Sequence, residues 1–220
     1  MKKIFSLIAM LAMFVGIADA QIVRSNSSKT ITQETVKEPS ETIHYVRFGL
    51  NLMKVRGDDI SSDWKDYEKP NLGYQLVWGF QKPLGPMFWG MEYGLGSRGY
   101  KLKDGDAKDT WFAHNGYFSP FNLGYKYAVS GDFEVEGHIG AYVSGDYAGK
   151  FVEDDGHDSE DFSIYDADDY SYVDAGMVFG FGVWYNSVGL DFSFQKGFID
   201  MAKDVKVHTS NFMIRLGFKF

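Results

Sequence analysis

The chain has 220 residues, a formal net charge of -8 at pH 7 and no cysteine. The lack of cysteine excludes disulfides and thiolate metal sites, and an acidic chain without a basic cluster is a poor match to nucleic acid. Aromatic residues make up 17% of the sequence and there are 25 glycines, a mixture that suits twisted strands with bands of aromatic side chains.

Residues 1–20 have the pattern of a secretory signal peptide. Lys2 and Lys3 form a basic start, an apolar run follows at residues 4–17, and Ala18-Asp19-Ala20 supplies the small residues expected at a cleavage site. The apolar run is shorter than the roughly 20 residues that a membrane helix needs. The sequence therefore predicts an exported protein.

Residues 21–41 are polar and predict a flexible periplasmic segment. From residue 42 to residue 220, apolar and polar residues alternate in successive segments, which is the period of a β-strand. Pro120 is expected to start the membrane-depth part of its strand or to mark a bulge. The predicted strands span residues 42–54, 70–82, 87–102, 111–129, 133–148, 171–185, 188–198 and 208–220.

The connections between these strands alternate in length. Tight turns follow the second, fourth and sixth strands, and longer polar loops at residues 56–69, 103–109 and 149–170 follow the first, third and fifth. Transmembrane barrels have short periplasmic turns, longer external loops and an even number of strands. We therefore predict an all-β protein, an eight-stranded antiparallel up-and-down transmembrane β-barrel at residues 42–220.

Steric fit decides which face of each strand meets lipid. One face is apolar and aromatic, with side chains such as Trp78, Trp89 and Phe121, whereas the other is rich in glycine with a few charges. The interior of an eight-stranded barrel is just wide enough for side chains, so the large aromatic rings would overfill it. We expect the apolar face to point to lipid and the charged face to point to the lumen.

Charges in so narrow an interior need partners. We predict an ion-pair network that fills the lumen, although a narrow channel or small-molecule uptake barrel remains an alternative. Both signs occur in similar number, whereas a selective pore usually has one dominant sign at its constriction. The predicted members are Arg47, Glu92, Arg98, Lys126, Glu134, Glu136, Asp191, Arg215 and Lys219.

The loop at residues 149–170 is a candidate site for Ca²⁺ or Mg²⁺, because carboxylates in high density bind divalent cations through oxygen. The spacing of an EF-hand is absent, and a solvated acidic loop without metal is the favoured interpretation. We expect no cofactor. The candidate ligands are Asp154, Asp155, Asp158, Asp166 and Asp168.

A lipid A-modifying barrel enzyme is a third alternative, and it would need a Ser/His/carboxylate set near one rim. His138 shares its face with Glu136, but Ser144 lies six residues along the strand and is too far for a direct bond. His208 and Ser210 are the other same-strand pair. Because no nucleophile elbow or HExxH motif occurs, we expect no enzyme.

Four segments of the chain carry a resemblance to a known family: residues 117–127, 172–176, 188–194 and 212–220. They resemble the porin-family or PorT-like outer-membrane β-barrels of the Bacteroidetes and, more distantly, the OmpA/OmpX-type eight-stranded barrels. The resemblance implies an outer-membrane protein in contact with membrane lipid and lipopolysaccharide. A structural or surface-interaction role through the external loops is expected, with the protein a monomer.

The last strand allows the most specific prediction. Phe212, Ile214, Leu216, Phe218 and Phe220 share one face, and the barrel family uses such a terminal aromatic residue as part of its assembly signal. The resemblance therefore implies recognition by the barrel-assembly machinery. To leave no open edge, this strand should pair with residues 46–52 and place its last side chain at the periplasmic rim, facing lipid.

Overall fold

The computed structural model describes residues 41–60, 62–167 and 169–220. The predicted signal peptide, residues 1–20, and nearly all of the polar segment at residues 21–41 lie outside them. Among the described residues, no helix is both long enough and apolar enough to cross a membrane.

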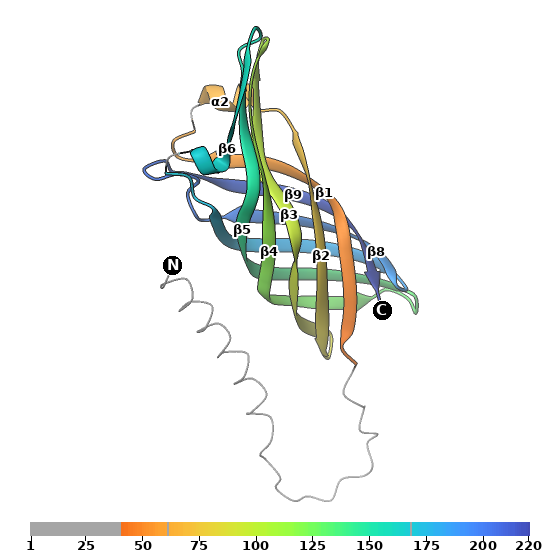
Figure 1. Cartoon of the computed structure of the whole chain (residues 1–220). Helices are drawn as coiled ribbons and strands as arrows, with labels where there is room; N and C mark the ends of the chain where they lie inside the picture. The colour runs from red at the N-terminus through yellow and green to blue at the C-terminus, as the bar shows by residue number, and fades with distance from the viewer. Residues whose placement is uncertain (1–40, 61, 168) are drawn as a thin grey trace, which may run out of the picture. The chain divides into compact units, whose positions relative to one another are not determined.

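Antiparallel strands form one closed ring in the described part of the chain (Figure 1). The eight strands of this ring are β1 (Ile43–Gly57), β2 (Asn71–Leu84), β3 (Met87–Asp104), β4 (Ala107–Ala128), β5 (Phe133–Asp154), β7 (Val173–Tyr185), β8 (Val188–Gly197) and β9 (Val207–Lys219). The connections contain α2 (Ser62–Tyr67), β6 (Ser159–Ser163) and η1 (Ile164–Asp166). The predicted fold class, an eight-stranded antiparallel barrel, is confirmed.

Pairing of the last strand with the first closes the ring. Phe218 lies opposite Val46, and Phe212 lies opposite Leu52, as the sequence predicts. The backbones of His44 and Phe220 exchange two hydrogen bonds of 3.1 and 2.9 Å. The Phe220 side chain is 72% exposed. Closure pairs the backbone N–H and C=O groups of both strands, and hydrocarbon could not form hydrogen bonds with those groups.

Alternation along the strands sorts side chains between two environments. In β8 every second residue is exposed and every other one is buried. Phe192 and Phe194 point outward, whereas Asp191 and Ser193 are buried in the lumen. Bulky apolar side chains thus face outward and small or polar ones face inward, as expected from the width of an eight-stranded barrel.

Pro120 lies at a bulge in β4, as predicted. The pairing with β5 shifts register between Phe118 and Phe121. The bulge adds one residue to β4, so the alternation changes phase. Ser119 and Asn122 are both buried although they are three positions apart along the strand. Proline lacks the N–H that a regular ladder needs, so an irregular position suits it.

Two predicted loops are wrong, because much of their length is strand. Residues 103–109 form the end of β3, a tight turn with Gly105 at φ 56°, and the start of β4. Residues 149–170 contain the end of β5, all of β6 and η1. The third long loop, residues 56–69, includes α2. Beyond the membrane both faces of a strand meet water, so the apolar alternation that identifies a strand disappears.

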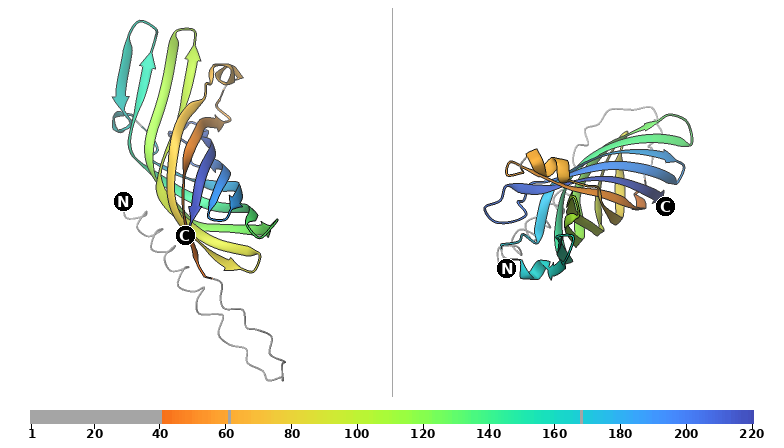
Figure 2. Two further views of the ribbon diagram at one scale, coloured as in Figure 1. Left: turned by 90° about the vertical axis from the view of Figure 1, so that its right-hand side faces the viewer. Right: turned by 90° about the horizontal axis from the view of Figure 1, so that it is seen from above.

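The extra strand length forms what we call the external arm, residues 99–112 and 149–163. Its strands pair in the order β3, β4, β5, β6. Figure 2 shows these hairpins extending past one end of the ring, while the C-terminus lies at the other end with the short turns. The arm therefore belongs to the side that carries the long connections.

Trp184 lies in the lumen toward the end with the short turns and is 1% exposed. The ring of this indole lies against the backbone of β9, where a Cβ on Gly217 would come within 2.5 Å of it. Lys219 places its Nζ 3.9 Å from the centre of the indole ring. The small residue at position 217 is thus required by a close approach.

We predict that Gly217→Leu weakens the barrel, because overpacking a filled interior costs about 1–3 kcal/mol. The matched control is Gly137→Leu, a strand glycine at which an added Cβ would meet no atom within 4 Å. Heat-modifiability on SDS gels measures the outcome. The folded band of Gly217→Leu should be lost at a lower temperature than that of Gly137→Leu, and equal temperatures would contradict the packing.

Candidate functional site

The lumen contains a layer of buried ion pairs centred on Arg47. Its guanidinium lies 2.7 Å from Glu92, makes a short contact to Glu136 and lies 3.9 Å from Asp191. Arg215 lies 2.5 Å from Asp191 and 3.7 Å from Glu92. Each of these side chains is at most 1% exposed. Two guanidiniums thus share three carboxylates in a space closed to water.

A second layer lies at the periplasmic rim. Lys219 lies 2.7 Å from Glu134 and 3.6 Å from Glu136. Lys126 lies 3.8 Å from Glu134. Counted with the first layer, four cations face four carboxylates, so this part of the lumen is electrically neutral.

The third layer lies toward the external end. Arg98, another predicted member of the network, is 2.7 Å from Asp146 and 3.8 Å from Asp174, so it is separate from the other eight. The carboxylate of Asp174 also accepts hydrogen bonds from Tyr142 and Thr209. The sequence interpretation did not include Asp146, although its position two residues after Ser144 on the same strand face is a usable signal.

An apolar cluster, which we call the external cap, lies beyond the third layer. Its buried members are Val55, Trp111, Ala113, Ile164, Tyr170 and Met201. The phenol of Tyr170 donates a hydrogen bond to Asp146, and Arg98 donates to the carbonyl of Ser171 at 2.7 Å. Burial raises the pKa of Tyr170, which keeps the phenol protonated as a donor. The loop before β7 is therefore held onto the third layer.

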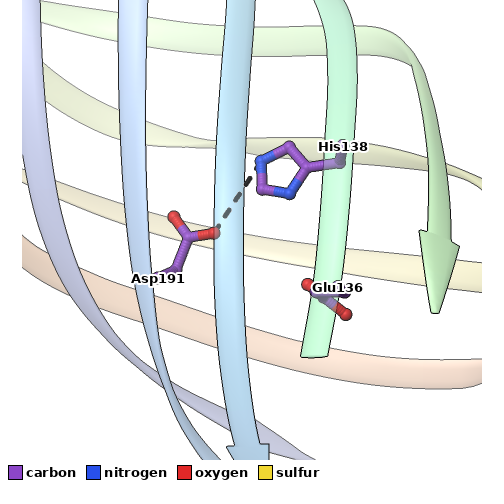
Figure 3. Close-up of side chains that lie close together, drawn as sticks. All are labelled: Glu136, His138 and Asp191. Atoms are coloured by element: carbon purple, nitrogen blue, oxygen red, sulfur yellow. Dashed lines mark ion pairs between the residues drawn. The ribbon is translucent and has the colours of Figure 1, made fainter. Parts of the chain in front are cut away.

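Glu136, His138 and Asp191 form a candidate metal centre in the lumen (Figure 3). Their ligand atoms lie within 4.8 Å of one another, and His138 lies 3.8 Å from Asp191. Both carboxylates, however, already contact Arg47, and Asp191 also contacts Arg215. A divalent cation would add two uncompensated charges to a neutral, buried group, which is costly. The arrangement suits ion pairing without a metal.

The same histidine is not arranged for nucleophilic catalysis. Ser193 donates its hydroxyl hydrogen bond to Asp191 at 2.5 Å rather than to His138. An activated serine needs a base within hydrogen-bond reach. The other pair considered, His208 and Ser210, lies on β9 opposite residues of β1.

The candidate ligands of the acidic loop are placed in different local structures. Asp155 accepts the backbone N–H groups of Asp158 and His157 at 2.8 Å each, and these bonds lower its pKa. Asp154 accepts from Gly156 at 3.0 Å. Asp166 lies in η1, and Asp168 is outside the described residues. In the described part of the loop, no three acidic side chains bring their oxygens together as a metal site would require.

A family model for an outer membrane protein β-barrel domain matches residues 37–203. The chain belongs to this family. It is therefore an outer-membrane β-barrel protein. No curated protein matches the sequence of this barrel.

Solved barrels are similar in fold. Ail of Yersinia pestis, in complex with the heparin analogue sucrose octasulfate, is 16% identical with a TM-score of 0.41, over 82% of this chain and 100% of Ail. Neisserial surface protein A is 15% identical with a TM-score of 0.42, over 80% and 97%. The N-terminal barrel of Pseudomonas aeruginosa OprF is 10% identical with a TM-score of 0.33, over 81% and 97%. These similarities concern the fold alone.

We predict that Arg47→Ala destabilises the barrel by about 3–5 kcal/mol, because it removes the cation shared by three buried carboxylates and leaves them with fewer positive charges than negative ones. The control is Lys150→Ala in the arm, where a 3.3 Å ion pair with Asp161 is 59% and 65% exposed. Such an exposed pair contributes about 0–1 kcal/mol. Urea unfolding in lipid vesicles measures both variants. A loss for Arg47→Ala no larger than for Lys150→Ala would refute the network as a structural element.

Proposed function

We propose that this protein is a non-conducting, non-enzymatic outer-membrane barrel with a structural or surface-interaction role carried by its external arm and loops. The observation that carries the proposal is the lumen, which is filled by paired charges and covered by the external cap. We further propose that it acts as a monomer and belongs with the porin-family or PorT-like barrels of the Bacteroidetes.

One small cavity inside the barrel supports a non-conducting role. Between the first and third layers lies a polar cavity of about 10 Å³, lined by residues such as Gln75, Asn115 and Gln195. A volume of about 10–15 Å³ holds a single water molecule. The ion pairs of the first layer lie on one side of this cavity, and those of the third layer lie on the other.

The external arm supports an interaction role of a particular chemistry. Residues 149–170 contain nine acidic residues, and Lys150 is their one Lys or Arg. Phe162 and Tyr165 are exposed in the same region. Ail was solved with a heparin analogue, but an acidic arm repels polyanions, so we favour a protein partner for this chain.

The lipid-facing surface and the last strand support the remaining partners. Exposed apolar side chains such as Leu72, Phe181 and Ile214 suit contact with outer-membrane lipid, and the rim beyond them is suited to lipopolysaccharide. We propose that the barrel-assembly machinery recognises β9 and its exposed terminal residue, Phe220.

Planar-bilayer recording tests the non-conducting role. The refolded protein should give no discrete current steps, because charged side chains and the cap occupy the path of an ion. The Arg47→Ala and wild-type proteins should be compared in the same bilayer. Discrete steps from the wild-type protein would exclude the proposal in favour of a narrow channel.

Trypsin treatment of intact cells tests the exposure of the arm. Cleavage is expected after Lys103 or Lys150, which are exposed in the arm, whereas Lys126 and Lys219 at the periplasmic rim should be protected. Mass spectrometry of the fragments identifies the sites. Cleavage at the rim in intact cells, with the arm untouched, would reverse the topology and remove the basis for a surface role.

A further inference from the structure

An apolar pocket of about 260 Å³ lies beside the external cap, and no role has yet been assigned to it. Its walls come from the external end of β1, from α2, from the bases of the arm in β3 and β5, and from the loops before β7 and β9. The pocket is distinct from the lumen, because its walls include loop residues outside the ring.

Aromatic side chains form much of the pocket wall. Trp64 and Tyr100 lie 5.3 Å apart at 65°, and Phe151 and Tyr170 lie 5.9 Å apart at 90°. A ring bound among these side chains would add aromatic contacts of the same kind, and such contacts contribute beyond simple burial. The wall is therefore suited to a planar ring.

Backbone hydrogen bonds hold the loops of the pocket in place. Met201 donates to the carbonyl of Val207 at 2.7 Å and accepts from Ser171 at 2.8 Å. Tyr170 and Met201 are at least nine-tenths buried. A pocket with walls already ordered loses little entropy when a ligand binds.

The size of the pocket limits the ligand. A dry cavity of about 150 Å³ holds benzene, and pockets for drug-sized molecules start at about 300 Å³. A volume of about 260 Å³ thus fits a molecule with one or two rings and a short substituent.

Asp59 sets the charge of the ligand. It is the one charged residue among those that line the pocket, and its side chain is exposed. Its Oδ2 accepts a hydrogen bond of 2.7 Å from the backbone of Lys206. Among the described residues, no Lys, Arg or His side chain forms an ion pair with it. A cation at the pocket mouth would be attracted to this carboxylate.

We propose that this pocket binds a small aromatic amine, with the ring against Trp64, Tyr100 and Phe151 and the ammonium beside Asp59. The site shares Tyr100 and Phe151 with the base of the arm. It gives the extracellular face of the barrel a small-molecule site in addition to its surface role.

The test uses the full chain in phosphatidylcholine nanodiscs and 5-fluorotryptamine as the probe. Fluorine-19 NMR should show saturable broadening with the wild-type protein. Asp59→Asn should weaken binding by about two- to fivefold, the range of an exposed ion pair. Ala202→Phe, which places a ring in the pocket, should abolish it. The controls are Asp58→Asn, exposed and outside the pocket lining, and Ala128→Phe at the periplasmic end.

The anionic analogue 5-fluoroindole-3-acetate separates the ring from the charge. The anionic analogue should bind the wild-type protein more weakly than the amine does. The two probes should bind Asp59→Asn with equal affinity. Equal affinity of the two probes for the wild type would overturn the assigned ligand class. Equal broadening with wild type and Ala202→Phe would mean partition into the bilayer and would overturn the site. If Ala202→Phe fails the heat-modifiability check, the comparison of Asp59→Asn with Asp58→Asn decides.

Discussion

The contacts of Arg47 connect strands that are not neighbours in the ring. Arg47 lies on β1, which pairs with β2 and β9, yet its carboxylate partners come from β3, β5 and β8. Backbone pairing sets only neighbouring registers, whereas these ion pairs form only if distant strands have the correct register together. A slip of one residue would turn such a charge toward lipid, where it costs about 2–4 kcal/mol at mid-depth. The polar lumen and the apolar exterior thus specify the same closure.

This dependence explains what the sequence could predict. Inside the membrane the two faces of each strand meet different surroundings, so alternation identified the strands and their inward faces. The need to leave no open edge predicted the pairing of β9 with β1. Most of the arm was predicted as loop because residues 103–109 and 149–163 have polar residues on both faces, and only the cross-strand register shows that they are paired. The pairing Lys108 to Asp154, for example, depends on the length of both strands.

For the candidate site, too, the sequence predicts the inward residues but not their partners. The inward position of Arg98 and Arg215 follows from parity along one strand, but their partners depend on distances across the lumen, which no single strand encodes. Arg98 therefore appeared to belong with the other charges, although it pairs with Asp146 in a separate layer. The carboxylates of Asp154 and Asp155 satisfy a turn, a local role that charge density alone cannot distinguish from metal binding.

The two ends of the lumen are closed by different kinds of side chain, partly exposed charges at one end and buried apolar rings at the other. At the periplasmic rim, Glu134 is 31% exposed and Lys126 is 13% exposed, so water assists the pairing of these charges. At the external end, loops without lipid or neighbouring strands must be ordered, and burial of apolar rings such as Trp111 and Tyr170 offsets their loss of conformational entropy. The cap that covers the lumen therefore also orders the loops around it. Loops held in this way are preorganised for any contact that they make.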